Sequence, residues 1–312
     1  MRVLEATDPS ELDALCARDE FFWLDVAGPS PAALDGLTER FNWHPLVRED
    51  LEHFGQRPKL ESYDDYMFIV FYGVHRGPDG RPALTEVHLV VSGSYVITVR
   101  HAGCHELEQL HDRFRRRPPG SEEFTVYSIM DSLTDSFFPV IEQLDDDLDD
   151  LEDRLVGAPG DTERSEVLRL RRLVVELRRV VAPQRDLAAR TLSDLETLPG
   201  LTRGEKDYFR DLYDHLIRIA EQLDSSRDLL TGAMDVYLSS QSNRLNEVSK
   251  QLTLIATIFL PLTFVTGFFG QNFGWLTGHI GGLWQFLVFG VGGLAVPIVL
   301  LYVWFRRRGY FG

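Results

Sequence analysis

A stripe of small and polar residues follows helical spacing near the C-terminal end of the chain. Its members recur three or four positions apart and therefore share one face of a helix: Ser242, Asn246, Ser249, Leu252, Ala256, Leu260, Thr263, Gly267 and Gly270. Such a face is unusual for a surface in contact with lipid. It suits close packing between membrane helices, and it equally suits the lining of a pore. Spacing alone does not separate these two interpretations.

Seven acidic residues crowd positions 145–153, around an apolar seam with helical spacing at Leu144, Leu148, Leu151 and Leu155. A break at Gly157-Ala158-Pro159-Gly160 follows, and the next predicted helix, about 162–192, is rich in arginine. We interpret the pair as an antiparallel hairpin with complementary charged faces rather than as a metal cage. Acids left without a partner there would also attract cations toward the membrane.

A second group of side chains has metal-ligand chemistry: His101, Cys104, His105 and His111. Zinc prefers histidine and cysteine ligands, and three of the four could share one face if the segment were helical. The segment lies at a strand-to-helix junction, so nothing in the sequence fixes that geometry. A zinc site here is therefore the less favoured interpretation.

Two apolar runs, 252–270 and 282–305, are each close to the ~20 residues that a helix needs to cross a membrane. No Asp, Glu, Lys or Arg occurs between Gln251 and Phe305. Basic residues precede the first run and follow the second at Arg306–Arg308, while the connecting loop has none. The positive-inside rule therefore predicts a multi-pass protein of the cell membrane, in contact with lipid, with both termini in the cytoplasm.

The charges fall almost entirely on the other side of this boundary. The net charge is −16 and the tail carries three arginines, so residues 1–250 carry −19. A domain so acidic excludes nucleic acid as a partner held by simple attraction. There is no phosphate-loop motif and no pairing of a nucleophile with a base, so we expect no enzyme. Two cysteines and the lack of a signal peptide fit a cytoplasmic soluble part.

We predict an α+β membrane protein. Residues 1–125 form a mixed α/β cytoplasmic domain, with strands at 21–26, 66–74, 86–91 and 94–100 and helices at 31–41 and 105–116. Residues 126–200 form the helical hairpin and 201–250 a very long stalk helix, which Thr202 and Glu205 would cap at its start. This helix continues into the first span at 251–270. A loop at 271–281, the second span at 282–305 and a basic tail at 306–312 complete the chain.

Residues 207–275, which include the run Gly270-Gln271-Asn272, resemble the stalk, first span and signature of the CorA family of magnesium and cobalt transporters. The segment His44–Glu61 (HPLVREDLEHFGQRPKLE) resembles that family too, as does the two-span C-terminus with its basic tail. The resemblance extends over nearly the whole chain. It implies a funnel-shaped homopentamer that carries divalent cations, in which the first span lines a central pore.

The resemblance assigns the outer mouth of that pore to Gly270, Gln271 and Asn272, where the family has Gly-Met-Asn. A ring of Asn272 amide oxygens would hold a hydrated magnesium ion through its water shell, because magnesium gives up its water reluctantly. Neutral oxygens also bind weakly enough to release the ion again. The pore below would be lined by Asn246, Ser249, Leu252, Ala256, Leu260, Thr263 and Gly267.

The resemblance also implies a regulatory magnesium site between the soluble domains of neighbouring subunits. The matching acids are Asp50 and Asp211, and Glu49 adjoins the first. Cations that bridge them would hold the pore shut at high cytosolic magnesium, and like charges would repel and loosen the ring when magnesium falls.

Three departures from the family pattern bear on selectivity and gating. Gln271 replaces methionine, the outer loop has no acid, and Ser249 replaces an apolar residue in the narrow neck. A zinc-transporting branch of the family varies the middle signature residue and lacks the acidic loop as well. A transporter mainly for zinc, or for another transition metal such as cobalt or nickel, therefore stays open, as does a membrane-tethered protein that moves nothing.

Overall fold

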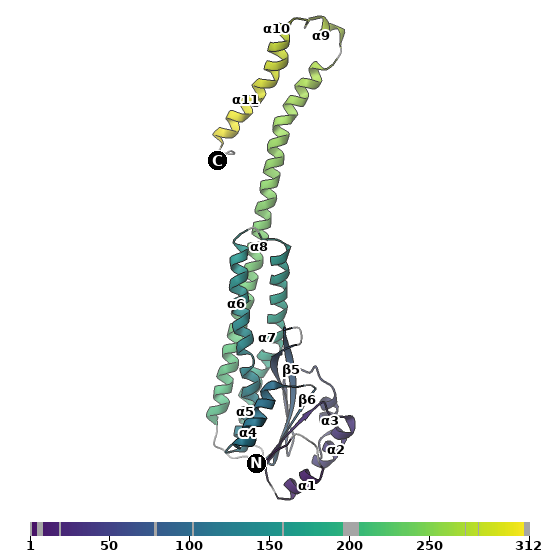
Figure 1. The fold of residues 1–312 in the computed structure, drawn as a ribbon, viewed down its shortest axis with the longest axis vertical. Coiled ribbons are helices and arrows are strands. Elements are labelled where there is room, and N and C mark those ends of the chain that lie inside the picture. Colours follow the sequence, from purple (N-terminus) through teal and green to yellow (C-terminus); the bar gives the residue numbers. More distant parts are fainter. Residues whose placement is uncertain are drawn as a thin grey trace. The chain divides into compact units, whose positions relative to one another are not determined.

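The computed structural model describes residues 2–4, 9–18, 20–77, 80–101, 103–157, 159–195, 206–271, 273–279 and 281–308 (Figure 1). The chain divides into two units, Met1–Val236 and Tyr237–Gly312. The helix α8, Lys206–Phe269, contributes to both. The first unit holds the sheet and most helices, and the second holds the two apolar spans.

A mixed six-stranded sheet forms the centre of the first unit, with the strand order β1-β2-β6-β5-β4-β3. Its strands are β1 Arg2–Leu4, β2 Phe22–Ala27, β3 Lys59–Ser62, β4 Met67–Arg76, β5 Pro82–Val91 and β6 Tyr95–Arg100. β1, β2 and β6 run parallel to one another, while β6, β5, β4 and β3 pair antiparallel. Ser92 N donates to Tyr95 O at the hairpin between β5 and β6, where the sequence predicts a turn.

Both faces of this sheet are buried, which explains why its strands read as nearly continuous apolar runs. Alternate residues of one strand belong to different faces: Trp23 faces a core shared with the helices α4, α5, α7 and α8, and Phe22 contacts Phe41 at the end of α2. The same alternation places Ile69 and Phe71 of β4 in the first core.

The helices of the first unit before α8 are α1 Pro9–Ala17, α2 Pro31–Phe41, α3 Pro45–Glu52, α4 His105–Arg116, α5 Glu122–Asp135, α6 Phe138–Leu155 and α7 Asp161–Leu195. Serine caps α2 and α5, because Ser30 and Ser121 accept hydrogen bonds from Ala33 N and Phe124 N. α6 and α7 form the predicted hairpin, and Arg169 of α7 is paired with Asp147 of α6 at 2.7 Å.

Two helices cover the part of β4 that β3 leaves unpaired, since β3 pairs only with Met67–Val70. Beyond that point Tyr72 N donates to Gln184 Oε1 of α7 at 2.5 Å, and Val74 N donates to Ser136 Oγ after α5 at 2.8 Å. These side chains satisfy backbone donors that an open sheet edge would expose. They also fix α7 and the end of α5 against the sheet.

The second unit contains the two helices that are long and apolar enough to cross a membrane, the end of α8 and the run Leu283–Arg307. A short helix, α9 Gly274–His279, lies in the connecting loop. The second span consists of α10 Leu283–Gln285, the π-helical η1 Phe286–Val291 and α11 Gly292–Arg307. The side chain of Gly293 is only a hydrogen, and a Cβ there would lie 3.5 Å from Val265 Cγ1 of the first span.

The predicted α+β class with a mixed domain, a helical hairpin and a long helix that enters the first span is confirmed. The sequence analysis missed β1, β3, α1, α3, α9 and the π-helical segment, which are short elements with weak periodic signals. The proposed Thr202–Glu205 cap lies outside the described residues.

Candidate functional site

The first span presents its small and polar stripe on an open face. The stripe residues Ser242, Asn246, Ser249, Leu252, Ala256, Leu260, Thr263 and Gly267 are all exposed within the single chain. The partly buried residues of the first span lie on another face, at Leu254, Thr257, Ile258, Pro261, Leu262 and Val265. Val265 is the residue nearest Gly293 of the second span. The stripe therefore faces away from the second span and is free to line a surface shared with other subunits.

Hydroxyl groups along this span are turned back onto the helix. Thr263 Oγ1 donates to Phe259 O at 2.8 Å, and Thr253 Oγ1 and Thr257 Oγ1 make the same bond to the preceding turn. These bonds satisfy the hydroxyl hydrogens without a water or side-chain partner. The hydroxyl oxygens keep free lone pairs that can accept a hydrogen bond from the water shell of an ion.

The first span ends at Gly270 because the backbone there approaches the preceding turn. Gly270 N donates to Thr266 O at 2.8 Å, and Gln271 N donates to Phe268 O at 3.3 Å. A Cβ at Gly270 would lie 2.9 Å from Thr266 O, closer than a side chain tolerates. Gln271 is exposed, and Asn272 lies outside the described residues. This close backbone contact explains why position 270 of the predicted mouth is a glycine.

We expect Gly270→Ala to reduce ion flux at least tenfold in reconstituted protein while the amount of inserted protein is unchanged. The added methyl group forces the end of α8 to shift, and a shift of that size misplaces the residues that follow. Gly232→Ala is the matched control, because it lies on the same helix outside the stripe and nothing lies within 4 Å of a Cβ at that position. Equal losses in both variants would contradict a special role for the backbone at Gly270.

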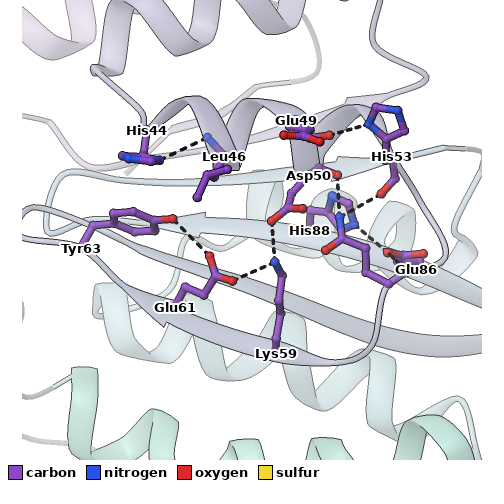
Figure 2. Close-up of polar contacts among 11 residues, drawn as sticks. His44, Leu46, Glu49, Asp50, His53, Lys59, Glu61, Tyr63, Glu86 and His88 are labelled. Carbon is purple, nitrogen blue, oxygen red and sulfur yellow. Dashed lines mark hydrogen bonds and ion pairs between the residues drawn. The ribbon is translucent and has the colours of Figure 1, made fainter.

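The predicted cytosolic acids Glu49 and Asp50 lie in the last turn of α3. Glu49 is exposed, and Asp50 is partly buried beside Lys59 of β3 (Figure 2). Lys59 Nζ also contacts Glu61 Oε1 at 2.8 Å, and Tyr63 donates to Glu61 Oε2. Although burial opposes it, hydrogen bonding to both carboxylates raises the pKa of Lys59. A cation that binds Asp50 therefore has to displace or share the charge of Lys59.

The third predicted acid, Asp211 of α8, lies in a group of ionisable residues from two helices. Asp131 and Asp135 of α5 and His215 of α8 offer ligand atoms that all lie within 4.8 Å of one another. Asp211 Oδ1 is 3.7 Å from His215 Nε2, and Asp211 Oδ2 accepts a hydrogen bond from Tyr127 at 3.2 Å. We call Asp131, Asp135, Asp211 and His215 the acidic cluster.

Burial and mutual repulsion disfavour the ionised carboxylates of Asp131 and Asp135 in the acidic cluster. Burial, followed by the nearby carboxylate of Asp135, raises the pKa of Asp131 to about 6. Burial and the charge of Asp211 also raise the pKa of Asp135, against the opposing effect of His215. Asp131 Oδ1 and His215 Nδ1 are buried atoms without a hydrogen-bond partner. A bound divalent cation would satisfy both and relieve the repulsion.

The raised pKa of Asp131 predicts a pH dependence of stability. A carboxyl whose folded pKa lies above its unfolded value stabilises the fold at low pH, and that contribution is lost as pH rises through about 6. In metal-free protein, Asp131→Asn should therefore gain about 1–2 kcal/mol relative to wild type between pH 4 and pH 7, after allowing for partial exposure. Thermal unfolding in EDTA measures this, and a pH-independent difference would contradict it.

The sequence analysis identified Asp211 but missed its partners. The signal was present as two pairs at i and i+4, Asp131 with Asp135 and Asp211 with His215, a spacing that puts both members on one helix face. What the sequence lacks is the packing of α5 against α8. Among the contacts of the described residues, neither Glu49 nor Asp50 touches this cluster, so one chain does not by itself bring the predicted sensor acids together.

The alternative zinc group does not assemble. His111 is buried, donates from Nε2 to Leu4 O and packs edge-on against Trp23, while His105 contacts Gln109. Cys104 is buried, and burial raises the pKa of its thiol to about 12, which disfavours the thiolate that binds metal. Within the described ranges, the acidic cluster is the one group of three or more metal-ligating side chains that converges.

Comparison with known proteins resolves the family. A family model described as CorA-like Mg2+ transporter protein matches residues 18–307. The chain belongs to the CorA family. It is 33% identical to YfjQ of Bacillus subtilis, over 93% of this chain and 90% of that protein. It is 32% identical to the cobalt/magnesium transport protein CorA of Thermotoga maritima, over 92% and 82% of the two chains.

Another relative of this CorA-family chain is a zinc transporter. It is 28% identical to the zinc transport protein ZntB of Yersinia pseudotuberculosis, over 95% of this chain and 90% of that one. The complete structure of the CorA magnesium transporter from Methanocaldococcus jannaschii has the same fold, with a TM-score of 0.79 at 22% identity over 91% and 90% of the chains. The protein is thus a membrane metal ion transporter with two transmembrane helices, and not an enzyme.

Proposed function

We propose that this CorA-family transporter is a homopentameric channel for magnesium influx, with cobalt and nickel as further ions. The observation that carries the proposal is the open stripe of the first span, which faces away from the second span and ends at Gly270. Rotational symmetry would bring five such stripes around one axis. The absence of charged side chains between residues 251 and 305 supports passage of an intact hydrated ion rather than a relay of protons.

Gly270, Gln271 and Asn272 form the outer ion site in this proposal. Asn272 supplies the ring of amide oxygens, and Gln271 adds oxygen character that favours magnesium over softer zinc. The loop beyond has no acid, so the ring and the membrane potential carry out capture without electrostatic concentration of ions. The basic tail and the charge-free loop support an orientation with both termini in the cytoplasm.

Intracellular magnesium gates the pore through the soluble units. Glu49 and Asp50 of one subunit and the acidic cluster of its neighbour provide carboxylate oxygens, the ligands that magnesium prefers. The proposal extends the sequence-based sensor of Asp50 and Asp211 by Asp131, Asp135 and His215. The raised pKa values of Asp131 and Asp135 support it, because bound metal would remove the repulsion between the carboxylates. Asp131 Oδ1 and His215 Nδ1, buried without a hydrogen bond, are free to bind that metal.

Zinc is the second candidate cargo, favoured by the similarity to ZntB and by the absence of acid in the outer loop. His215 also gives the acidic cluster one nitrogen ligand of the kind zinc prefers. Neither span contains a histidine or a cysteine. His279 lies in the loop helix between them. The chemistry of the pore itself therefore favours a hard ion.

Flux into liposomes decides between these cargoes. Purified protein is reconstituted with a magnesium or a zinc indicator inside, and influx is measured at matched free-ion concentrations under an inside-negative potential. We expect magnesium influx to exceed zinc influx at least tenfold and to be inhibited by cobalt. Zinc influx well above magnesium influx would overturn the magnesium proposal, and influx equal to that of empty liposomes would overturn transport itself.

A further inference from the structure

A cavity of about 450 Å³ lies in the first unit, apart from the acidic cluster and the spans. It is lined by the loop after α3 at Phe54–Pro58, the strands β4 and β5, the residues that follow β6, and α7. Ligand pockets in proteins usually have volumes of roughly 300–1,000 Å³. The cavity is therefore large enough for an organic molecule and much larger than a single inorganic ion needs.

The loop wall of this cavity is held in place before any ligand arrives. The buried carboxylate of Glu86 accepts hydrogen bonds from Gly55 N and Gln56 N and contacts His88 Nε2 at 2.8 Å. These bonds outweigh the effect of burial and lower the pKa of Glu86, so its charge is already compensated. Gly55 has a φ of 94°, which favours glycine at this point of the loop. A preformed wall loses little entropy on binding.

Aromatic rings form much of the lining. Phe54 is stacked on the buried ring of His88, with centroids 4.7 Å apart, and His101 meets it edge-on at 5.5 Å. Tyr72 lies in the wall between the loop and α7 and donates to Gln56 O. Rings fixed in this way offer flat apolar surface to a flat ligand.

Two arginines from separate elements line the same cavity, Arg57 of the loop and Arg179 of α7. Neither has an ion-pair partner among the contacts of the described residues. Other arginines of this acidic chain do have a carboxylate partner, among them Arg40, Arg48, Arg100, Arg169, Arg178, Arg185 and Arg210. Glu86 and Glu176 also line the cavity, so the four formal charges of the lining balance. The Glu86 carboxylate is already held by Gly55 N, Gln56 N and His88, whereas the two guanidinium groups have no such partner in the described part of the chain.

Two histidines also line the cavity. His75 Nδ1 contacts Thr85 Oγ1 at 2.7 Å, and His101 lies exposed at the rim. Two guanidinium groups that can each form paired hydrogen bonds, in a cavity that also contains imidazole nitrogens, suit a phosphate group. The aromatic wall suits a planar ring attached to it. From this combination we propose that the cavity binds a small phosphorylated compound with a flat ring, of the size of a mononucleotide.

Equilibrium dialysis of the full-length protein in detergent with AMP and with inorganic phosphate tests the proposal. EDTA is present so that no divalent ion recruits the anion to the acidic cluster. We expect saturable AMP binding at one site per chain, at least tenfold tighter than phosphate. Arg57→Gln and Arg179→Gln should each weaken AMP binding about tenfold. Arg172→Gln is the matched control: it is an exposed α7 arginine outside this cavity.

Leu84→Trp provides a variant that leaves both arginines in place and fills the cavity, which Leu84 lines. It should weaken AMP binding at least as much as Arg179→Gln. Unchanged AMP binding in Arg179→Gln or in Leu84→Trp would overturn the site, as would no AMP binding at millimolar concentration. Phosphate binding as tight as AMP binding would overturn the part of the proposal that concerns the ring. The measurement needs neither transport nor metal, so its failure is distinct from failure of the proposed channel.

Discussion

Asn272→Ala is expected to abolish magnesium influx into liposomes, with a loss of at least a hundredfold, while the protein is still inserted as an oligomer. The amide oxygen of this residue is proposed to hold the water shell of the entering ion. The loop that follows contains no carboxylate that could take over this role. A methyl group leaves the mouth without that interaction on every subunit, which explains why the effect should be large.

Gln271→Met is the matched control for this prediction, because it changes the neighbouring signature residue and restores the residue usual in the family. We expect magnesium influx within the same order as wild type. Influx is measured from the initial rate at several free magnesium concentrations, and the oligomer is checked by gel filtration. Wild-type influx in Asn272→Ala with an unchanged oligomer would remove Asn272 from the ion path.

Hydrophobic pattern and length were enough to predict the main elements of this fold. The two spans each run for about the 20 residues needed to cross a bilayer without a charged side chain. The strands β4, β5 and β6 are rich in β-branched and aromatic residues. Short elements were missed for a physical reason. β3 has only the residues Lys59–Ser62, and α9 in the loop is a single six-residue helix, so neither shows a period that a sequence pattern can reveal.

The candidate sites were predicted unevenly. The spacing of the stripe follows from helix geometry alone, so its common face could be read from the sequence, although its separation from the second span could not. The acidic cluster depends on how α5 packs against α8, with 75 residues or more between its two pairs of ligands. Likewise, nothing in the sequence indicates that Lys59 neutralises Asp50, because that contact depends on the way β3 returns beside α3.

The neutralisation of Asp50 by Lys59 leads to a second prediction with a large effect. Millimolar magnesium should protect the soluble unit of the wild-type protein from protease, and Asp50→Asn combined with Asp211→Asn should remove this protection and leave the pore open at high magnesium. The double change removes the carboxylates that a bridging cation needs and removes repulsion that metal would otherwise relieve. Limited proteolysis over a range of free magnesium measures this. The magnesium concentration for half-maximal protection should be at least tenfold higher in the double variant than in wild type.

Lys59→Gln tests the same contact in the opposite direction. The lysine competes with metal for Asp50, so its removal should lower the magnesium concentration needed for half-maximal protection by about threefold to tenfold. Asp228→Asn is the matched control, because this acid is on α8 but belongs to no metal-ligating group in the described part of the chain.

If Lys59→Gln weakened protection, Asp50 would need the lysine for its position rather than compete with it for a cation. If the double variant were protected as well as wild type, the sensor would have to be placed elsewhere, while loss of protection in Asp228→Asn as well would show that general surface charge controls the response.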